Sequence, residues 1–174
     1  MTLENERSKG WTKVKHVCTP AGEYRRPNDL VGKIPDPHVS HRGADLCYQN
    51  LSGMNFIGAD FTEANLEGAD LSDANCEGAT FHWANLTSAR LVNGDFCSAD
   101  FTDAELAGAN LTGANLGDAK LVHANLSKTI LVHATLRETD FTMADLRSAD
   151  LTDTIGISEA ILDGAKKNGA KGFR

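Results

Sequence analysis

The chain has 174 residues, with 24 acidic against 17 basic side chains and a formal charge of −7. This balance disfavours direct nucleic-acid binding, which needs clustered Lys and Arg, and no apolar run approaches the roughly 18–20 residues that cross a bilayer. The polar start MTLENERSKG lacks the apolar stretch of a secretory signal. We therefore expect a cytoplasmic protein with no membrane and no direct nucleic-acid contact.

Residues 1–43 contain all four prolines and show little periodicity. This composition predicts an irregular segment that caps whatever follows, with a partner-binding arm as the alternative role. Cys18 lies in this segment and Cys47 lies just beyond it. A bridge between them stays open, although a reducing compartment would leave all four cysteines as thiols.

Residues 44–153 repeat every five residues without insertion or deletion. Of the 22 units, 21 have Leu or Phe at the centre, 17 have Ala two places earlier and 16 have Asp or Asn one place earlier. A period of five fits neither the period of about 3.6 of a helix nor the period of about 2 of a strand. The chain must therefore turn once per unit, with the central residue and the Ala inside.

The central phenylalanines indicate how many units close one coil. Phe61, Phe81, Phe101 and Phe141 are separated by multiples of 20, with Leu121 in the gap. Four units per coil, a square cross-section, sort these rings into one column stacked at the strand spacing of about 4.8 Å. Asn65 and Asn85 are placed to form a similar ladder outside.

Units such as Ala64-Asn65-Leu66 and Ala109-Asn110-Leu111 resemble the pentapeptide repeat family, over 110 of the 174 residues. The resemblance implies an all-β fold, a right-handed quadrilateral parallel β-helix or solenoid, here of about 5.5 coils. Some members of the family are acidic dimeric rods that occupy the DNA-binding saddle of type II topoisomerases such as DNA gyrase. The resemblance therefore implies that binding to a type II topoisomerase is one role that this protein can have.

Residues 154–174 leave the repeat. The register fails at Gly156, and Ser158 followed by an apolar stretch and Lys166-Lys167 is typical of a short helix with an N-cap and cations in its last turn. We expect this C-terminal cap, with its short helix and basic tail, to lie across the last coil.

The negative charge belongs to the repeats, which carry 17 acidic and 5 basic residues, a net charge of −12. Its density is comparable with that of duplex DNA, which has one charge per roughly 1.7 Å. The candidate acidic face is the one with the Phe61 column, and its acids are Asp60, Glu63, Asp100, Asp103 and Asp140. The simpler interpretation, which we favour, is that Asp before each centre belongs to the chemistry of the repeat.

Chemistry-bearing motifs are missing from the sequence. His123 and His133 fall ten residues apart, on opposite faces, and cannot share a metal. We find no nucleophile with a base, no phosphate loop and no redox pair, so we expect no enzyme, no cofactor and no metal. Cys76 replaces a central Leu or Phe and is expected to be buried and inert, with Cys47 and Cys97 more available.

Large apolar side chains at outward positions are the candidates for a partner surface. They cluster near the Phe61 face as Trp83, Val122, His123 and Met143. The predicted function is that of a non-enzymatic protein-interaction scaffold with an unknown protein partner. The alternative is an acidic DNA mimic that binds a type II topoisomerase, and homodimerisation through a coil end is a further use.

Overall fold

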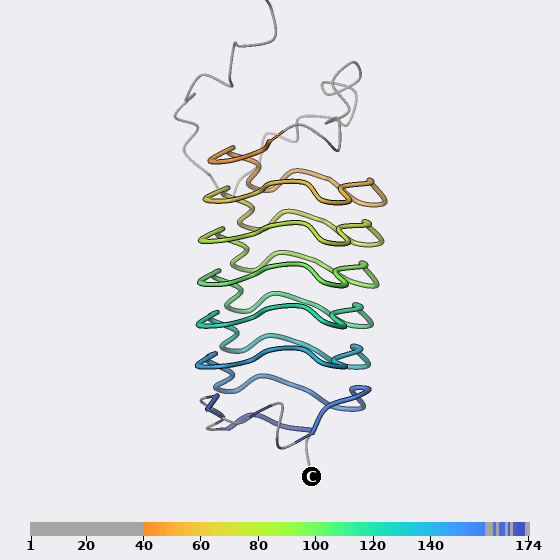
Figure 1. The fold of residues 1–174 in the computed structure, drawn as a ribbon, viewed down its shortest axis with the longest axis vertical. Helices are drawn as coiled ribbons and strands as arrows, with labels where there is room; N and C mark the ends of the chain where they lie inside the picture. The colour runs from red at the N-terminus through yellow and green to blue at the C-terminus, as the bar shows by residue number, and fades with distance from the viewer. Residues whose placement is uncertain (1–39, 159–161, 163, 166, 168, 173–174) are drawn as a thin grey trace, which may run out of the picture.

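The structure is a computed structural model that describes residues 40–158, 162, 164–165, 167 and 169–172. Coils stack into a tower, with the first repeats at one end and the last at the other (Figure 1). These residues form no helix and no strand longer than one bridged residue. They are joined by parallel bridges between residues 20 apart, from Asp45 with Asn65 to Thr135 with Ile155. One coil is therefore 20 residues, as the spacing of the phenylalanines predicts.

Backbone hydrogen bonds explain why the strands are so short. The N–H of Leu66 donates to Asn85 O at 2.7 Å, and the N–H of Asn65 donates to Ala44 O at 2.8 Å. The C=O of Leu66 then accepts the N–H of Ala69 at 3.0 Å, which closes a turn. Each unit thus pairs with the coils on both sides and immediately turns a corner.

The turn places its third residue in the left-handed region. All 23 residues at this position from Gly43 to Asp153 have positive φ, and 16 of them are not glycine. A hydrogen bond from the fourth residue to the first, with positive φ at the third, is the pattern of a type II turn. The corner in each unit is confirmed, whereas the left-handed residue had not been predicted.

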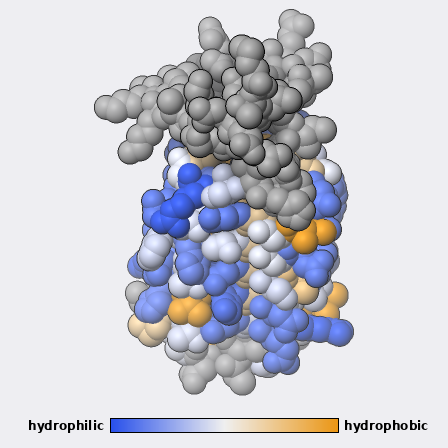
Figure 2. All heavy atoms as spheres, turned by 45° about the horizontal axis from the view of Figure 1, so that its top comes forward, coloured by the Kyte–Doolittle hydropathy of each residue, from blue (hydrophilic) through white to orange (hydrophobic). Residues whose placement is uncertain are grey.

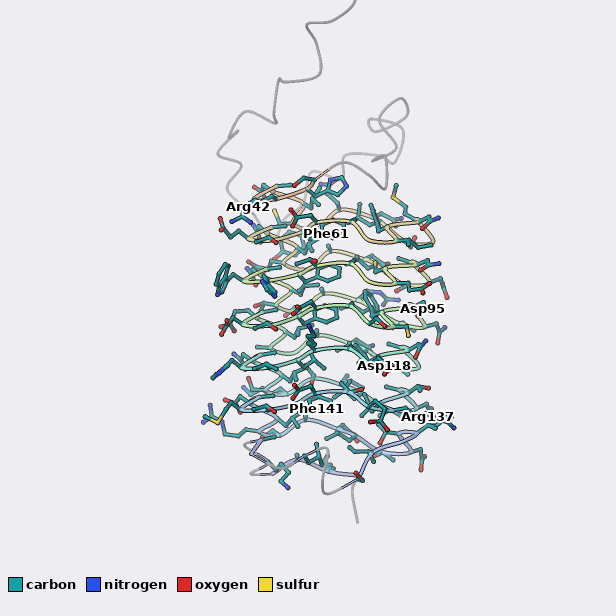
Figure 3. The ribbon with its side chains drawn as sticks, in the orientation of Figure 1. Arg42, Phe61, Asp95, Asp118, Arg137 and Phe141 are labelled. Atoms are coloured by element: carbon teal, nitrogen blue, oxygen red, sulfur yellow. The ribbon has the colours of Figure 1, made fainter. Side chains whose placement is uncertain are left out.

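The interior is filled by the predicted columns. Every central residue from Leu51 to Leu151 has at most 1% of its surface exposed. The Phe81 ring stacks on Phe61 at 5.0 Å and on Phe101 at 4.7 Å between centroids, both with an interplanar angle of 5°. Figure 3 shows Phe61 and Phe141 within the outline of the coils, while Arg42 and Arg137 project from it.

The repeat begins one unit earlier than predicted. His41 occupies a central position, is only 5% exposed and stacks on Phe61 at 4.9 Å between ring centroids. Its N–H donates to Asp60 O at 2.7 Å, as a Leu or Phe would. Burial lowers the pKa of His41, although Asp60 opposes this effect, so the ring is held neutral as a flat apolar substitute. The rest of the expected N-terminal cap, residues 1–39, lies outside the described residues.

Departures from Ala at the inward position have local causes. The hydroxyls of Thr129 and Thr139 are buried but donate to Leu126 O at 2.7 Å and Leu116 O at 2.8 Å. A Cβ on Gly94 would lie 2.5 Å from the ring of Phe96. The glycine therefore makes room for a phenylalanine that also contacts Phe81 and Phe101.

At the other end the chain folds back under the last coil. Leu162 is fully buried against the core, and Lys171 bridges Asp150 in parallel. Lys171 donates to Ala149 O and accepts from the N–H of Leu151, both at 2.9 Å. The expected helix falls partly on residues 159–161, 163 and 166, outside the described part. The described residues of this stretch form turns and one bridge.

The cysteines differ from one another. Cys47 is disulfide-bonded, so the expectation of an available thiol there is wrong, and Cys18 lies outside the described residues. Cys76 is fully buried, as predicted, and burial raises the pKa of its thiol well above the usual range. Cys97 is a half-exposed free thiol.

Candidate interaction surface

The Asp or Asn before each centre has one repeated task. Its side-chain Oδ1 accepts the backbone N–H two residues further on, for example from Thr102 to Asp100 at 3.0 Å. Such Asx bonds stabilise a chain reversal that the peptide alone would leave with an unpaired N–H. All sixteen Asp and Asn residues at this position make the bond: Asp45, Asn50, Asn55, Asp60, Asn65, Asp70, Asn75, Asn85, Asp95, Asp100, Asn110, Asn115, Asn125, Asp140, Asp145 and Asp150.

The same side chains link neighbouring coils. The Nδ2 of Asn85 donates to Asn65 Oδ1 at 3.3 Å, which confirms the predicted ladder, and Asn65 donates to Asp45 at 3.1 Å. On another face, Asn115 donates to Asp95 at 2.9 Å. These outward Asp and Asn side chains therefore stabilise the turns and the contacts between coils. This agrees with the simpler interpretation, in which the acidic residues belong to the chemistry of the repeat.

The candidate acidic face is partly neutralised. Glu63 accepts from Arg42 Nη2 at 2.6 Å. Asp100 lies 3.0 Å from His82 Nε2 and 3.9 Å from Lys120 Nζ. Asp103 is exposed and makes no ion pair with the described residues. The predicted acidic face thus holds its members on one side of the tower but does not present five unpaired charges.

Hydrogen bonds lower the pKa of three carboxylates of this face. The Thr62 hydroxyl is the main cause of the lowered pKa of Asp60, and the Thr142 hydroxyl has the same effect on the pKa of Asp140. Burial raises the pKa of Asp100, but hydrogen bonds from Thr102 and His82 outweigh it and leave the pKa below its usual value. These acids stay charged well below neutral pH.

The candidate partner surface follows one corner of the tower but is not continuous. Trp83 and Met143 are 59% and 50% exposed, and both occupy the third position of their turns. They lie three coils apart, about 14 Å at the strand spacing, with Asp103 and His123 between them in the same column. Val122, beside His123, is half-buried.

Apolar side chains are similarly scattered elsewhere. Figure 2 shows isolated hydrophobic patches among hydrophilic residues on the face in view. Within the described ranges, the large exposed apolar residues are Tyr48, Ile57, Trp83, Ile130, Met143 and Ile155. No broad apolar surface joins the four predicted residues. They share a face of the tower, but they lie on different coils along it.

Within residues 40–158 and the described part of the C-terminal segment, no three His, Cys, Asp or Glu side chains gather in a way that could hold a metal ion. The same residues include no helix that is long and apolar enough to span a membrane.

The family follows from the repeat itself. Residues 42–78, 79–118 and 114–153 match the model for pentapeptide repeats, in eight copies. This chain is a pentapeptide repeat protein. Such proteins are generally structural or interaction proteins, and no model of an enzyme family matches. No sequence among the curated proteins is similar to this pentapeptide repeat protein at a significant level.

Solved structures similar to this pentapeptide repeat protein come from several sources. A structure of QnrB1, a plasmid-mediated fluoroquinolone resistance protein, is 16% identical, with a TM-score of 0.43 over 78% of this chain and 83% of that one. HetL, involved in heterocyst differentiation regulation in Nostoc sp. strain PCC 7120, is 25% identical, with a TM-score of 0.24 over 77% and 72%. A protein of the Arabidopsis thaliana thylakoid lumen is 28% identical, with a TM-score of 0.24 over 70% and 81%.

Proposed function

We propose that this pentapeptide repeat protein is a non-catalytic scaffold that binds a protein partner on the outside of its tower. The supporting observation is that all sixteen Asp and Asn side chains before the centres accept main-chain N–H groups. Their oxygens serve the turns, and the core is filled with apolar side chains. Because the interior is filled and these sixteen side chains stabilise turns, the outer surface is the part of the molecule that can recognise a partner.

The location and the oligomeric state belong to the same proposal. The cytoplasm stays our prediction, although the disulfide at Cys47 points the other way because such bonds persist mainly in oxidising compartments. A homodimer through a coil end also stays a prediction. Its physical basis is that the end of a stack of parallel strands presents backbone groups that can pair with another chain.

The scaffold can be tested by site-specific photo-crosslinking in living cells. A crosslinking residue is placed in turn at four exposed turn positions, one on each face: Asn93, Gly58, Met143 and Lys128. We expect one discrete adduct from one or two faces, competed by excess purified protein. If none of the four positions gives an adduct, the scaffold proposal is refuted.

The alternative is a DNA mimic that acts on a type II topoisomerase such as DNA gyrase. It is supported by the net charge of −12 over the repeats and by Asp side chains whose pKa is lowered. Against it, the Phe61 face carries −4 and the other faces −3, −3 and −2, so no single stripe dominates. The −4 already includes Lys120, and Arg42, which lies outside the predicted repeats, offsets a further charge through its ion pair with Glu63.

A gyrase supercoiling assay separates the two functions. The protein is titrated with and without a quinolone at two salt concentrations. Inhibition or protection that weakens steeply with salt would replace the scaffold by the mimic, because electrostatic contacts are screened. The scaffold predicts no effect at high micromolar protein.

A further inference from the structure

Trp83 is a poor fit for its place in the backbone. It is the third residue of its turn, with a φ of 54°, a region that bulky side chains rarely adopt. Its N–H reaches Thr102 O at 3.3 Å, whereas the equivalent bonds of Glu63 and Asp103 measure 2.8 and 3.0 Å. The fold accommodates this residue with a longer backbone hydrogen bond than its neighbours in the column make.

The indole is held on one side and open on the other. Its neighbour His82 contacts it edge to face, with ring centroids 5.8 Å apart and an interplanar angle of 64°. The Nε2 of His82 lies 3.0 Å from Asp100 Oδ1. Trp83 is still 59% exposed, more than any other large apolar residue of the described part. An aromatic surface is thus displayed in a defined position.

The charges beside the indole are negative. Asp103 occupies the same turn position one coil further on and makes no ion pair with a described residue. Glu63, one coil back, is engaged by Arg42, and Asp100 is engaged by His82 and Lys120. Asp103 is therefore the carboxylate next to Trp83 whose charge these neighbours leave uncompensated.

We propose that Trp83 and Asp103 form a binding site for an arginine side chain in a basic segment of a partner protein. A guanidinium stacks on an indole face and at the same time pairs with a carboxylate, which a neutral side chain cannot do. The net charge of −12 over the repeats favours the approach of a basic segment and opposes that of a nucleic acid. This inference rests on the proposed function as an interaction scaffold and names the chemistry of its partner.

The test uses blocked tetra-arginine as the probe and blocked tetra-citrulline as its neutral match. The chain has two tryptophans, Trp11 and Trp83, so a Trp11→Phe background leaves the fluorescence of Trp83 as the signal. We expect saturable binding of tetra-arginine and none of tetra-citrulline. Asp103→Asn should weaken the binding about two- to fivefold, the usual range for an exposed ion pair.

Calorimetry extends the test to variants without the indole. Trp83→Gly should weaken binding about two- to thirtyfold while the circular dichroism stays unchanged, because glycine adopts positive φ freely. Asp153→Asn is the matched control, since Asp153 holds the same turn position on another face. Its binding should equal that of the parent protein.

Two results would overturn the inference. Equal weakening by Asp103→Asn and Asp153→Asn would show a diffuse attraction of charge, and unchanged binding by Trp83→Gly would show that the indole has no part. The scaffold itself would fall only if crosslinking from the four faces also failed, so the two failures can be told apart.

Discussion

Replacing Phe81 by Leu tests whether the aromatic column contributes to stability beyond filling space. Phe81 lies between Phe61 and Phe101, with ring centroids at 5.0 and 4.7 Å. Phe81 also meets the ring of Phe96 edge to face, at 6.2 Å between centroids. Each aromatic pair contributes about 0.5–1.5 kcal/mol beyond the burial of its area, so the loss of three pairs predicts about 1.5–4.5 kcal/mol. The same column already accommodates Leu121, which is fully buried, and we therefore expect the fold to be retained.

The assay is urea unfolding followed by circular dichroism, with a double-mutant cycle. Phe81→Leu is made alone, Phe101→Leu is made alone, and the two are combined. Because both single variants remove their shared stack, their combined effect should fall short of the sum by about 0.5–1.5 kcal/mol. Strict additivity would refute the view that stacking, and not only apolar area, stabilises the column.

Three further substitutions probe the core and the acids, and a labelling experiment probes the thiols. Leu106→Asp buries a charge at a site with 0% exposure and should abolish folding by circular dichroism, whereas Asp103→Asn should change stability by less than about 0.5 kcal/mol. Hydrogen bonds from Thr142 lower the pKa of Asp140, so its stabilisation is present above its usual pKa and is lost as pH falls through the lowered value. The Asp140→Asn variant lacks this titration. Between neutral and acid pH, its free energy of unfolding should therefore fall by less than that of the parent protein, as acid titrations followed by circular dichroism would measure. A maleimide should label Cys97 in the native protein and Cys76 only after unfolding, and rapid native labelling of Cys76 would contradict its burial.

The sequence was sufficient for the coil but not for the turn. Period and residue size predicted which side chains point inward and that Phe61, Phe81 and Phe101 stack, since both follow from the 20-residue register. The left-handed third residue was missed although glycine holds that position at Gly43, Gly53, Gly58, Gly68, Gly78, Gly108 and Gly113. Those glycines were the available signal, because glycine adopts positive φ without strain.

Other differences arise from contacts that no single position reveals. The predicted repeat began at residue 44 and did not include His41, whose place in the core is explained by its stack on Phe61. Gly94 depends on the ring of Phe96, two residues away. For the candidate surface, the prediction grouped Trp83 with Met143, which share one column but lie three coils apart. Asp103, assigned there to the acidic face alone, proves to be the neighbour of Trp83 in its column.

The Asx bonds separate the charge of this protein from its folding. The acceptor is an oxygen that aspartate and asparagine share, and the sixteen positions are divided equally, with eight of each. A single-base change in a codon can exchange one for the other without removing the bond that the turn requires. The electrostatic field of the tower can therefore drift or be selected, one unit charge at a time, while the coil stays the same. Relatives of equal architecture are then free to differ widely in which partners they attract.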